Sequence, residues 1–265
     1  MAAGVKKGKK SKAIGVTITQ VAIVVALLVW MEVAVANDWV NRVFMASPSQ
    51  IVDELIYMLK ENTLWPHLSI SLQEVAVGYL ISVVAGIGLG VLYVSFPLVE
   101  KLLDPFVAAA MAVPKTAVMP LLIVWFGIGF KSKVILVFLF CFFNILYNTV
   151  TGAKQTRIEH LKLAQVFKAS RAQTVFKVLL PSALPSIFNG LRVTAATAIT
   201  GVVFAEMAAA KNGLGYVLNE AQAVLNTPRL FLVIILVTVL SVLFVALVNL
   251  IERLVCRRWT PRRSA

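Results

Sequence analysis

Residues 230–251 read LFLVIILVTVLSVLFVALVNLI, and none of these side chains carries a charge. A helix needs about 20 apolar residues to cross the hydrocarbon core of a bilayer. Five further stretches reach about that length, near 14–36, 72–95, 102–126, 133–151 and 190–210. None of them alternates with the two-residue period of a barrel strand. The sequence therefore predicts an all-α, polytopic membrane bundle of about six transmembrane helices.

The composition of the whole chain agrees with this assignment. The 265 residues are 60% hydrophobic and only 14% charged, whereas soluble domains contain about 25% charged residues. An ordinary soluble enzyme and a disordered chain are therefore excluded. Two cysteines, Cys141 and Cys256, cannot form the disulfide framework of a secreted domain. His67 and His160 lack metal-ligand spacing, so we expect no metal site.

The net charge of +13 is distributed unevenly over the predicted loops. With six spans, both termini lie on the same side as 96–104 and 152–192, and this side carries 18 Lys and Arg residues against 6 on the other. Cytoplasmic loops of membrane proteins are enriched in Lys and Arg. We therefore predict that both termini are cytoplasmic and that the basic charge faces anionic lipid, not nucleic acid.

The first predicted span has some features of a secretory signal peptide. Five lysines precede it, and it ends with the small residues Ala34-Val35-Ala36. The apolar run 14–36 exceeds the usual 7–15 residues of a signal-peptide core, so we expect an uncleaved helix. In the outer loop 37–68, the sequence Ser47-Pro48-Ser49 indicates a turn, and residues 53–60 indicate a short surface helix or lid.

The connection between spans four and five is too long for a simple turn. Its first part is amphipathic, with one apolar face formed by Ile158, Leu161, Ala164 and Phe167. Ser170 and Gln173 fit a capping box, so a second helix is expected to begin there and to stop at Pro181, before a turn to Pro185. One apolar stripe suits either a membrane-surface helix pair or a docking site for a soluble partner.

Three segments together carry a recognisable pattern. The predicted cytoplasmic loop contains AQVFKAS at 164–170 and FKVLLPSALPSIFNGLR at 176–192. PKTAVMPLLIVWFGIG occupies 114–129, and AEM at 205–207 precedes GLGY at 213–216. From about residue 46 to 259, the chain resembles the permeases of binding-protein-dependent ABC importers. The most similar branch serves nitrate, sulfonate, taurine and pyrimidine-type substrates.

This resemblance implies a domain organisation and a set of partners. The type I permease domain would span 69–256, with a coupling loop at 152–185, between a basic cytoplasmic N-terminus at 1–13 and a basic tail at 257–265. Expected partners are cytoplasmic ABC ATPase subunits, an extracytoplasmic substrate-binding protein and a second permease copy in a homodimer, in a bacterial inner membrane. The residues expected to couple to the ATPase are Ile158, Leu161, Ala164, Phe167, Lys168, Ala169 and Ser170.

The chain departs from the family pattern within this loop. The family usually begins the loop with Glu-Ala-Ala and has a glycine four residues after the second Ala, whereas this chain has Lys162, Leu163, Ala164 and Lys168. Either Lys168 enters the left-handed region, at a cost of about 1–2 kcal/mol, or the turn shifts to Ser170. The docking surface is also more basic than the family norm.

No nucleotide site or catalytic set is recognisable. The segment 4–11 lacks the spacing of a phosphate-binding loop, and no nucleophile and base occur together. We therefore expect a non-catalytic subunit that binds no cofactor, with ATP hydrolysed by a partner. The alternatives are a stand-alone secondary transporter or channel, which should show repeats or several intramembrane carboxylates, and a membrane-embedded enzyme, which should show clustered catalytic residues.

Polar groups inside predicted spans are candidates for the translocation pathway, because they are expensive to leave in lipid. The pathway candidates are Lys115, Thr194, Thr197 and Glu206. Glu206 would pair with Lys115 or Lys211, cap a neighbouring backbone or contact substrate, and Glu32 is expected to reach the membrane surface. A stripe of small residues every fourth position, Gly78, Ser82, Gly86 and Gly90, predicts close helix packing within one subunit rather than a dimer seam.

Overall fold

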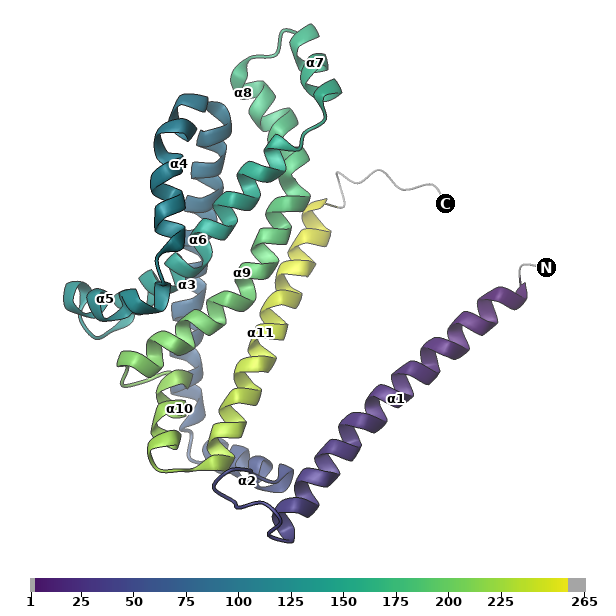
Figure 1. Ribbon diagram of the computed structural model, residues 1–265, viewed down its shortest axis with the longest axis vertical. Helices are drawn as coiled ribbons and strands as arrows, with labels where there is room; N and C mark the ends of the chain where they lie inside the picture. Colours follow the sequence, from purple (N-terminus) through teal and green to yellow (C-terminus); the bar gives the residue numbers. More distant parts are fainter. Residues whose placement is uncertain (1–2, 257–265) are drawn as a thin grey trace. The chain divides into compact units, whose positions relative to one another are not determined.

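The computed structural model describes residues 3–256, with side chains described from Val16 onward (Figure 1). Within residues 3–256 all regular structure is helical. The predicted basic tail at 257–265 and the side chains of the N-terminal lysines lie outside this description. The helices are α1 (Ala3–Ala36), α2 (Pro48–Lys60), α3 (Leu64–Ser95), α4 (Pro97–Ala112), η1 (Lys115–Val118), α5 (Met119–Phe126), α6 (Phe130–Lys154), α7 (Ile158–Val166), α8 (Arg171–Thr174), η2 (Val175–Leu179), α9 (Leu180–Ala209), α10 (Leu214–Ala223) and α11 (Thr227–Cys256).

The predicted membrane helices are confirmed, with one modification. Among the described residues, five helical segments are long and apolar enough to cross a bilayer, at Val16–Ala36, Leu64–Ser95, Phe130–Lys154, Arg171–Ala209 and Thr227–Cys256. The third predicted span is broken: Pro97–Ala112 and Lys115–Phe126 meet at 88°, and they make a sixth span only if counted together. Pro114 lies between the two halves, where its missing N–H and fixed φ interrupt the helix.

The chain forms two compact units. The first unit comprises the residues up to 64 and 218–235, and the second comprises 65–217 and the chain from 236 onward. In the first unit, the Glu32 carboxylate accepts hydrogen bonds from the Ser49 backbone N at 3.0 Å and Oγ at 2.6 Å, so it fastens α1 to α2. Arg229 Nε donates to Glu54 Oε1 at 2.6 Å, which fastens α11 to α2.

The segment predicted as a turn at 47–49 instead begins α2. Ser47 is the N-cap, its side chain accepts from the Gln50 N–H, and Gln50 completes a capping box. Pro48 occupies the first helical turn, where its missing N–H has no helical partner to lose. The surface helix expected at 53–60 is therefore confirmed, but it starts earlier.

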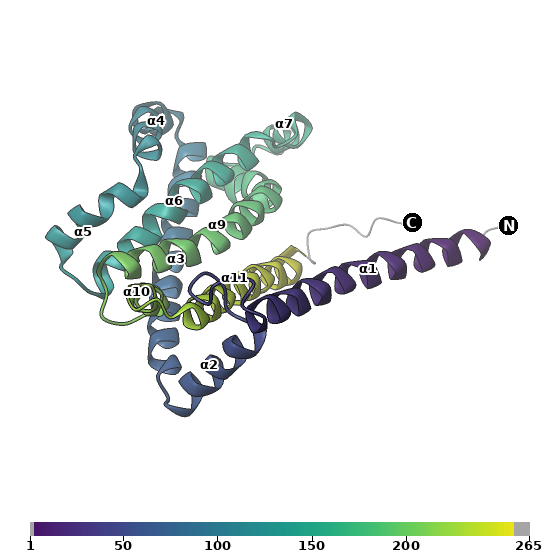
Figure 2. The ribbon, with the colours of Figure 1, turned by 60° about the horizontal axis from the view of Figure 1, so that its bottom comes forward.

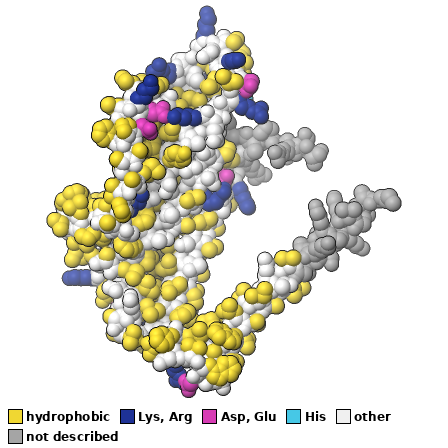
Figure 3. Space-filling model, in the orientation of Figure 1, with side chains coloured by type: hydrophobic (Ala, Val, Ile, Leu, Met, Phe, Trp, Pro, Cys, Tyr) yellow, Lys and Arg dark blue, Asp and Glu magenta, His cyan; other side chains and the backbone are white. Residues whose placement is uncertain are grey.

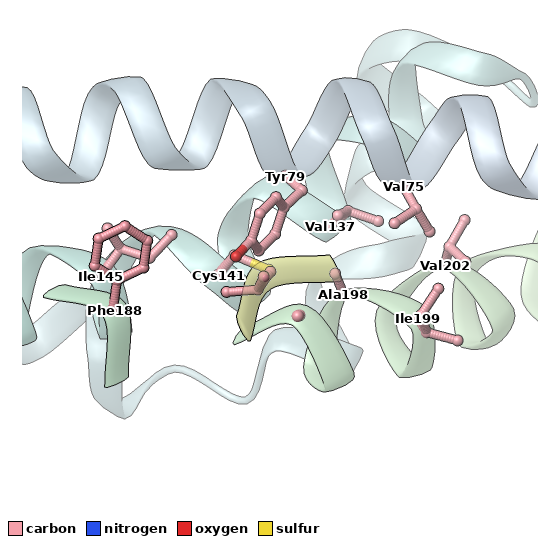
Figure 4. Close-up of a cluster of buried hydrophobic side chains, with 11 residues drawn as sticks. Val75, Tyr79, Val137, Cys141, Ile145, Phe188, Ala198, Ile199 and Val202 are labelled. Carbon is pink, nitrogen blue, oxygen red and sulfur yellow. The ribbon is translucent and has the colours of Figure 1, made fainter. Parts of the chain in front are cut away.

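The core of the second unit lies where α3, α6, α9 and α11 meet (Figure 4). Tyr79, Cys141, Ala198 and Val202 are buried in this cluster. The helices α6 and α9 run side by side in both ribbon views (Figures 1 and 2). Two smaller buried clusters, around Met119 and Leu122 and around Ala183 and Ile187, pack the two ends of α6 and α9.

The small-residue stripe of α3 packs against α6, as predicted for packing within one subunit. A Cβ on Gly78 would lie 2.7 Å from the Val137 side chain, and one on Gly90 would lie 2.6 Å from Thr149. Such contacts are shorter than real Cβ contacts, so the two helices approach this closely only because these α3 positions lack a side chain.

The helix predicted to stop at Pro181 continues through it. The chain passes from α8 through the π-helical turn η2 directly into α9, and Pro185 lies inside α9. A π turn shifts the hydrogen-bonding ladder by one residue. Pro181 then falls in the first turn of α9, where a missing N–H is tolerated. The expected turn at 182–185 is therefore absent.

Candidate functional site

The helix pair predicted between spans four and five is present as α7 and α8. The helix α7 ends in a Schellman-type turn, because the Ala169 N–H donates to the Ala164 O at 2.9 Å and the Lys168 N–H donates to the Gln165 O at 2.9 Å. Lys168 has φ +51°, so it occupies the left-handed position where the family usually has glycine. Of the two alternatives, the left-handed Lys168 is therefore the correct one.

The capping box that starts the second helix is also confirmed. The Ser170 side chain accepts from the Gln173 N–H, and the Gln173 side chain accepts from the Ser170 N–H at 2.8 Å. These local bonds fix the angle at which α8 leaves the turn after α7. The shape of the predicted coupling loop is thus set by backbone capping close to Lys168.

The apolar face of α7 differs from the predicted one. Ala164 is buried and Leu161 is half-buried, because this side of α7 turns toward η2 and the neighbouring end of α3. Ile158 remains exposed, and Phe167 is 76% exposed. Two further apolar side chains that the stripe did not include, Leu163 and Val166, are exposed as well. Their apolar character is visible in the sequence, but spacing alone does not tell which face of α7 packs and which stays exposed.

A groove of about 620 Å³ separates α7 from the start of α9. Its walls combine apolar side chains of α7 with polar and apolar groups that follow the capping box, namely His160, Leu163, Ala164, Phe167, Ala169, Gln173, Lys177, Val178, Pro181 and Ser182. Figure 3 shows Lys and Arg side chains gathered at this end of the second unit. An exposed apolar helix beside a basic rim is a surface that a protein partner can grip.

Glu206, in the last turn of α9, is only 1% exposed and acts as a clamp. Its carboxyl group accepts hydrogen bonds from Ser71 Oγ at 2.5 Å and from the Gly215 N–H at 2.7 Å. Ser71 Oγ accepts from the Leu214 N–H at 2.9 Å. These bonds join α3, α9 and the N-terminus of α10, as the capping alternative predicted. The carboxyl oxygens bind these groups rather than Lys115 or Lys211.

Sequence reasoning missed a buried ion pair next to this clamp. Lys133 Nζ donates to Glu74 Oε1 at 2.8 Å, and both side chains are buried. Both groups act electrostatically on Glu206. Glu74 lies inside the predicted span 72–95, so the rule that selected Glu206 should have selected it too. Lys133 stands at the edge of the predicted span 133–151, and the structure buries it inside the second unit.

The remaining pathway candidates lie in two different places. Lys115 is half-buried at the bend between α4 and α5, where its Nζ donates to the Met111 O at 3.3 Å and lies 5.8 Å from the centre of the Phe143 ring. Thr194 is fully buried, and its hydroxyl donates to the Gly190 O of its own helix at 2.8 Å. Thr197 is half-buried one turn further along α9. The structure therefore does not bring the four candidates together.

Within residues 3–256, no group of three or more His, Cys, Asp or Glu side chains is arranged to hold a metal ion. The polar groups around Glu206 form hydrogen bonds, and Glu74 and Lys133 beside them form an ion pair. Such groups can position helices.

Comparisons with known proteins agree with this architecture. Residues 78–259 match the family described as "Binding-protein-dependent transport system inner membrane component". The taurine transport system permease protein TauC of Escherichia coli K12 is 32% identical over 251 residues, which cover 93% of this chain and 90% of the relative. A putative aliphatic sulfonates transport permease protein, SsuC of Bacillus subtilis 168, is 33% identical over 214 residues, with coverages of 81% and 78%.

A solved structure supports the fold independently. A chain from the inward-facing conformations of the MetNI methionine ABC transporter matches with a TM-score of 0.64. The match covers 74% of this chain and 98% of that chain at 22% identity, so it shows a shared fold. Together, the membrane helices, the family match and these relatives establish that the chain belongs to the binding-protein-dependent transport system inner membrane components and is a multi-pass permease subunit of an ABC importer.

Proposed function

We propose that this chain is the translocation subunit of a bacterial inner-membrane importer that is driven by a separate cytoplasmic ABC ATPase and supplied by an extracytoplasmic binding protein. The family description names the binding protein and the inner membrane. The family assignment favours this function over a stand-alone transporter or channel. The relatives TauC and SsuC are named for taurine and aliphatic sulfonates, which suggests a small sulfonate-type solute.

The exposed apolar face of α7 is the observation that carries this proposal. Val166 is 77% exposed and Phe167 is 76% exposed, and Phe167 lines the groove between α7 and the start of α9. Apolar side chains anchored in a partner's pocket are typical of the energetic centre of a protein interface. In this proposal the ATPase binds α7, and the continuous helix from α8 through η2 to α9 carries its movement toward the membrane.

The translocation pathway is proposed to form between two copies of this chain. One bundle supplies half of such a pathway, and a two-fold axis would place two copies of each lining residue around one solute. Lys115 and Thr197 are the candidates with surface available for this role. Thr194 and Glu206 are buried inside the subunit, so we assign them to helix positioning in this conformation.

Copurification tests the proposal directly. The tagged chain, expressed with an ABC ATPase subunit from the same organism, is expected to retain that ATPase in detergent. The double variant Val166→Asp and Phe167→Asp should lose it, because two charges would replace apolar anchors at the interface. Val224→Asp is the matched control, since Val224 is also exposed and apolar but lies between α10 and α11. Equal ATPase recovery from the double variant and the control would overturn the proposal.

A further inference from the structure

Three ionisable side chains are buried together where α3, α6 and α9 meet, beside the start of α10. Glu74 and Glu206 are each 1% exposed, and Lys133 is 4% exposed. Lys133 pairs with Glu74, whereas Glu206 accepts hydrogen bonds from Ser71 and from the Gly215 N–H. These three side chains therefore combine two acids with one base.

One carboxyl oxygen of Glu74 has no hydrogen-bond donor. Lys133 Nζ donates to Oε1, but the buried Oε2 has no partner among the described residues. Glu74 lies three residues after Ser71, so its side chain shares the face of α3 from which Ser71 binds Glu206. The carboxyl group of Glu206 accordingly acts on that of Glu74 as a hydrogen-bonding neighbour. Two ionised carboxylates can only accept hydrogen bonds, so this contact has a donor only when one of them is protonated.

The charge of the cluster supports the same conclusion. With both acids ionised, the three buried side chains carry a formal charge of −1, and with one added proton they carry none. An isolated charge is so costly to remove from water that a buried group takes up or releases a proton instead. Two carboxyl groups that share one site retain a proton because two adjacent negative charges repel each other.

The chain that follows α9 covers the Glu206 carboxyl group. A Cβ on Gly213 would lie 2.2 Å from Glu206 Cδ, so the backbone presses directly on this group. The Leu214 N–H donates to Ser71 Oγ, and the Gly215 N–H donates to Glu206. Opening of the α10 start therefore brings water to the two acids.

We propose that Glu74 and Glu206 share one bound proton, which makes the bonds that hold the start of α10 on Ser71 and Glu206 a pH-dependent latch. The proton lies between Glu74 Oε2 and the Glu206 carboxyl group. Opening exposes both acids to water, where a glutamate is ionised above about pH 5, so the proton is released. A rising pH therefore favours the open state. This inference does not depend on the proposed ATPase contact.

His67, which stacks on Tyr216, is another titratable group at the latch. Its Nδ1 accepts from the Gly213 N–H at 3.1 Å. A protonated imidazole has no acceptor nitrogen, so protonation of His67 at low pH would weaken the latch. This effect has the opposite sign to that of the carboxyl pair, and the direction of the pH dependence therefore tells the two apart.

Amide hydrogen exchange of peptides that cover 213–217, in the full chain in detergent, measures the opening equilibrium once intrinsic exchange rates are corrected for pH. In the parent chain, the opening constant should rise severalfold from about pH 7 to pH 8, up to the tenfold per unit that one released proton allows. In Glu74→Gln, the amide oxygen still accepts from Lys133 and the NH₂ donates to Glu206. This variant needs no proton, so its opening constant should not rise. Glu220→Gln, an exposed acid of α10, should behave like the parent.

Infrared difference spectroscopy detects the proton itself. The C=O stretch of a protonated carboxyl group is separate from the carboxylate bands. The parent chain at neutral pH should show a carboxylic-acid band that Glu74→Gln and Glu206→Gln each lose and that Glu220→Gln retains. The parent spectrum is informative even where a variant fails to fold. The inference would be overturned by a parent chain without this band, by a band that persists in Glu74→Gln, or by an opening constant that is independent of pH in the parent or rises equally in Glu74→Gln.

Discussion

Replacing Glu206 tests whether a buried carboxyl group holds the start of α10. In Glu206→Ala, the Gly215 N–H and the Ser71 hydroxyl both lose their acceptor while they remain buried. Each buried polar group left without a partner costs about 1–3 kcal/mol. The variant should therefore destabilise the α10 start by about 2–6 kcal/mol. Glu206→Gln keeps one carbonyl oxygen and should cost about 1–3 kcal/mol, because only one donor is left unpaired.

Amide hydrogen exchange, read by mass spectrometry on peptides that cover 213–217, measures this effect in detergent micelles. A loss of 2 kcal/mol corresponds to about a 30-fold rise in the opening equilibrium, so exchange in Glu206→Ala should accelerate by at least that factor. Glu220→Ala is the control, because Glu220 also lies on α10, the helix whose start is probed, but is exposed. The opening free energy of this variant should stay within about 0.5 kcal/mol of the parent value. Exchange at 213–217 that is the same in both variants would refute the clamp.

Three further predictions concern packing and loop geometry. Gly90→Ala should destabilise the folded chain by about 1–3 kcal/mol in thermal unfolding, because the new Cβ would collide with Thr149 of α6. Gly88→Ala is the control: its Cβ meets no neighbour, so it should stabilise the chain by up to about 1 kcal/mol. Lys168→Gly should relieve about 1–2 kcal/mol of left-handed backbone strain and therefore slow amide hydrogen exchange at the end of α7. Faster exchange there would contradict the assigned turn. Arg192→Ala should lower stability by about 1–3 kcal/mol, since the guanidinium bonds Glu252 of α11, and combining it with Glu252→Gln should add less than the sum of the single effects.

Hydropathy and capping patterns predicted much of this fold because they act locally. A run of apolar residues identifies a span without reference to its neighbours, and the Ser170 capping box is complete within four residues. The break that the prolines of the third span predict is found at Pro114, but the passage of the helix through Pro181 was not predicted, because a proline breaks a helix only when no π turn or first-turn position accommodates it. Whether a proline is accommodated or breaks the helix depends on the hydrogen-bond register of the whole helix.

The candidate site was predicted in outline and missed in detail. The α7 helix, its capping and the left-handed alternative at Lys168 followed from sequence, but the exposed face did not. Spacing identifies which residues share a face, not which face packs against η2. Glu74 and Lys133 are 59 residues apart, and only the packing of α3 on α6 brings them together. Long-range pairs of this kind are invisible to a local pattern.

ATP-driven uptake into proteoliposomes tests the central claim most directly. The assay contains the complete transporter, with the binding protein on the side opposite the ATPase and ATP on the ATPase side. Proteoliposomes with the parent chain, and those with the Val224→Asp control, are expected to accumulate solute. Proteoliposomes with the double variant Val166→Asp and Phe167→Asp should accumulate no more solute with ATP than without it, because the ATPase cannot bind α7. Undiminished ATP-driven uptake by the double variant would contradict the account.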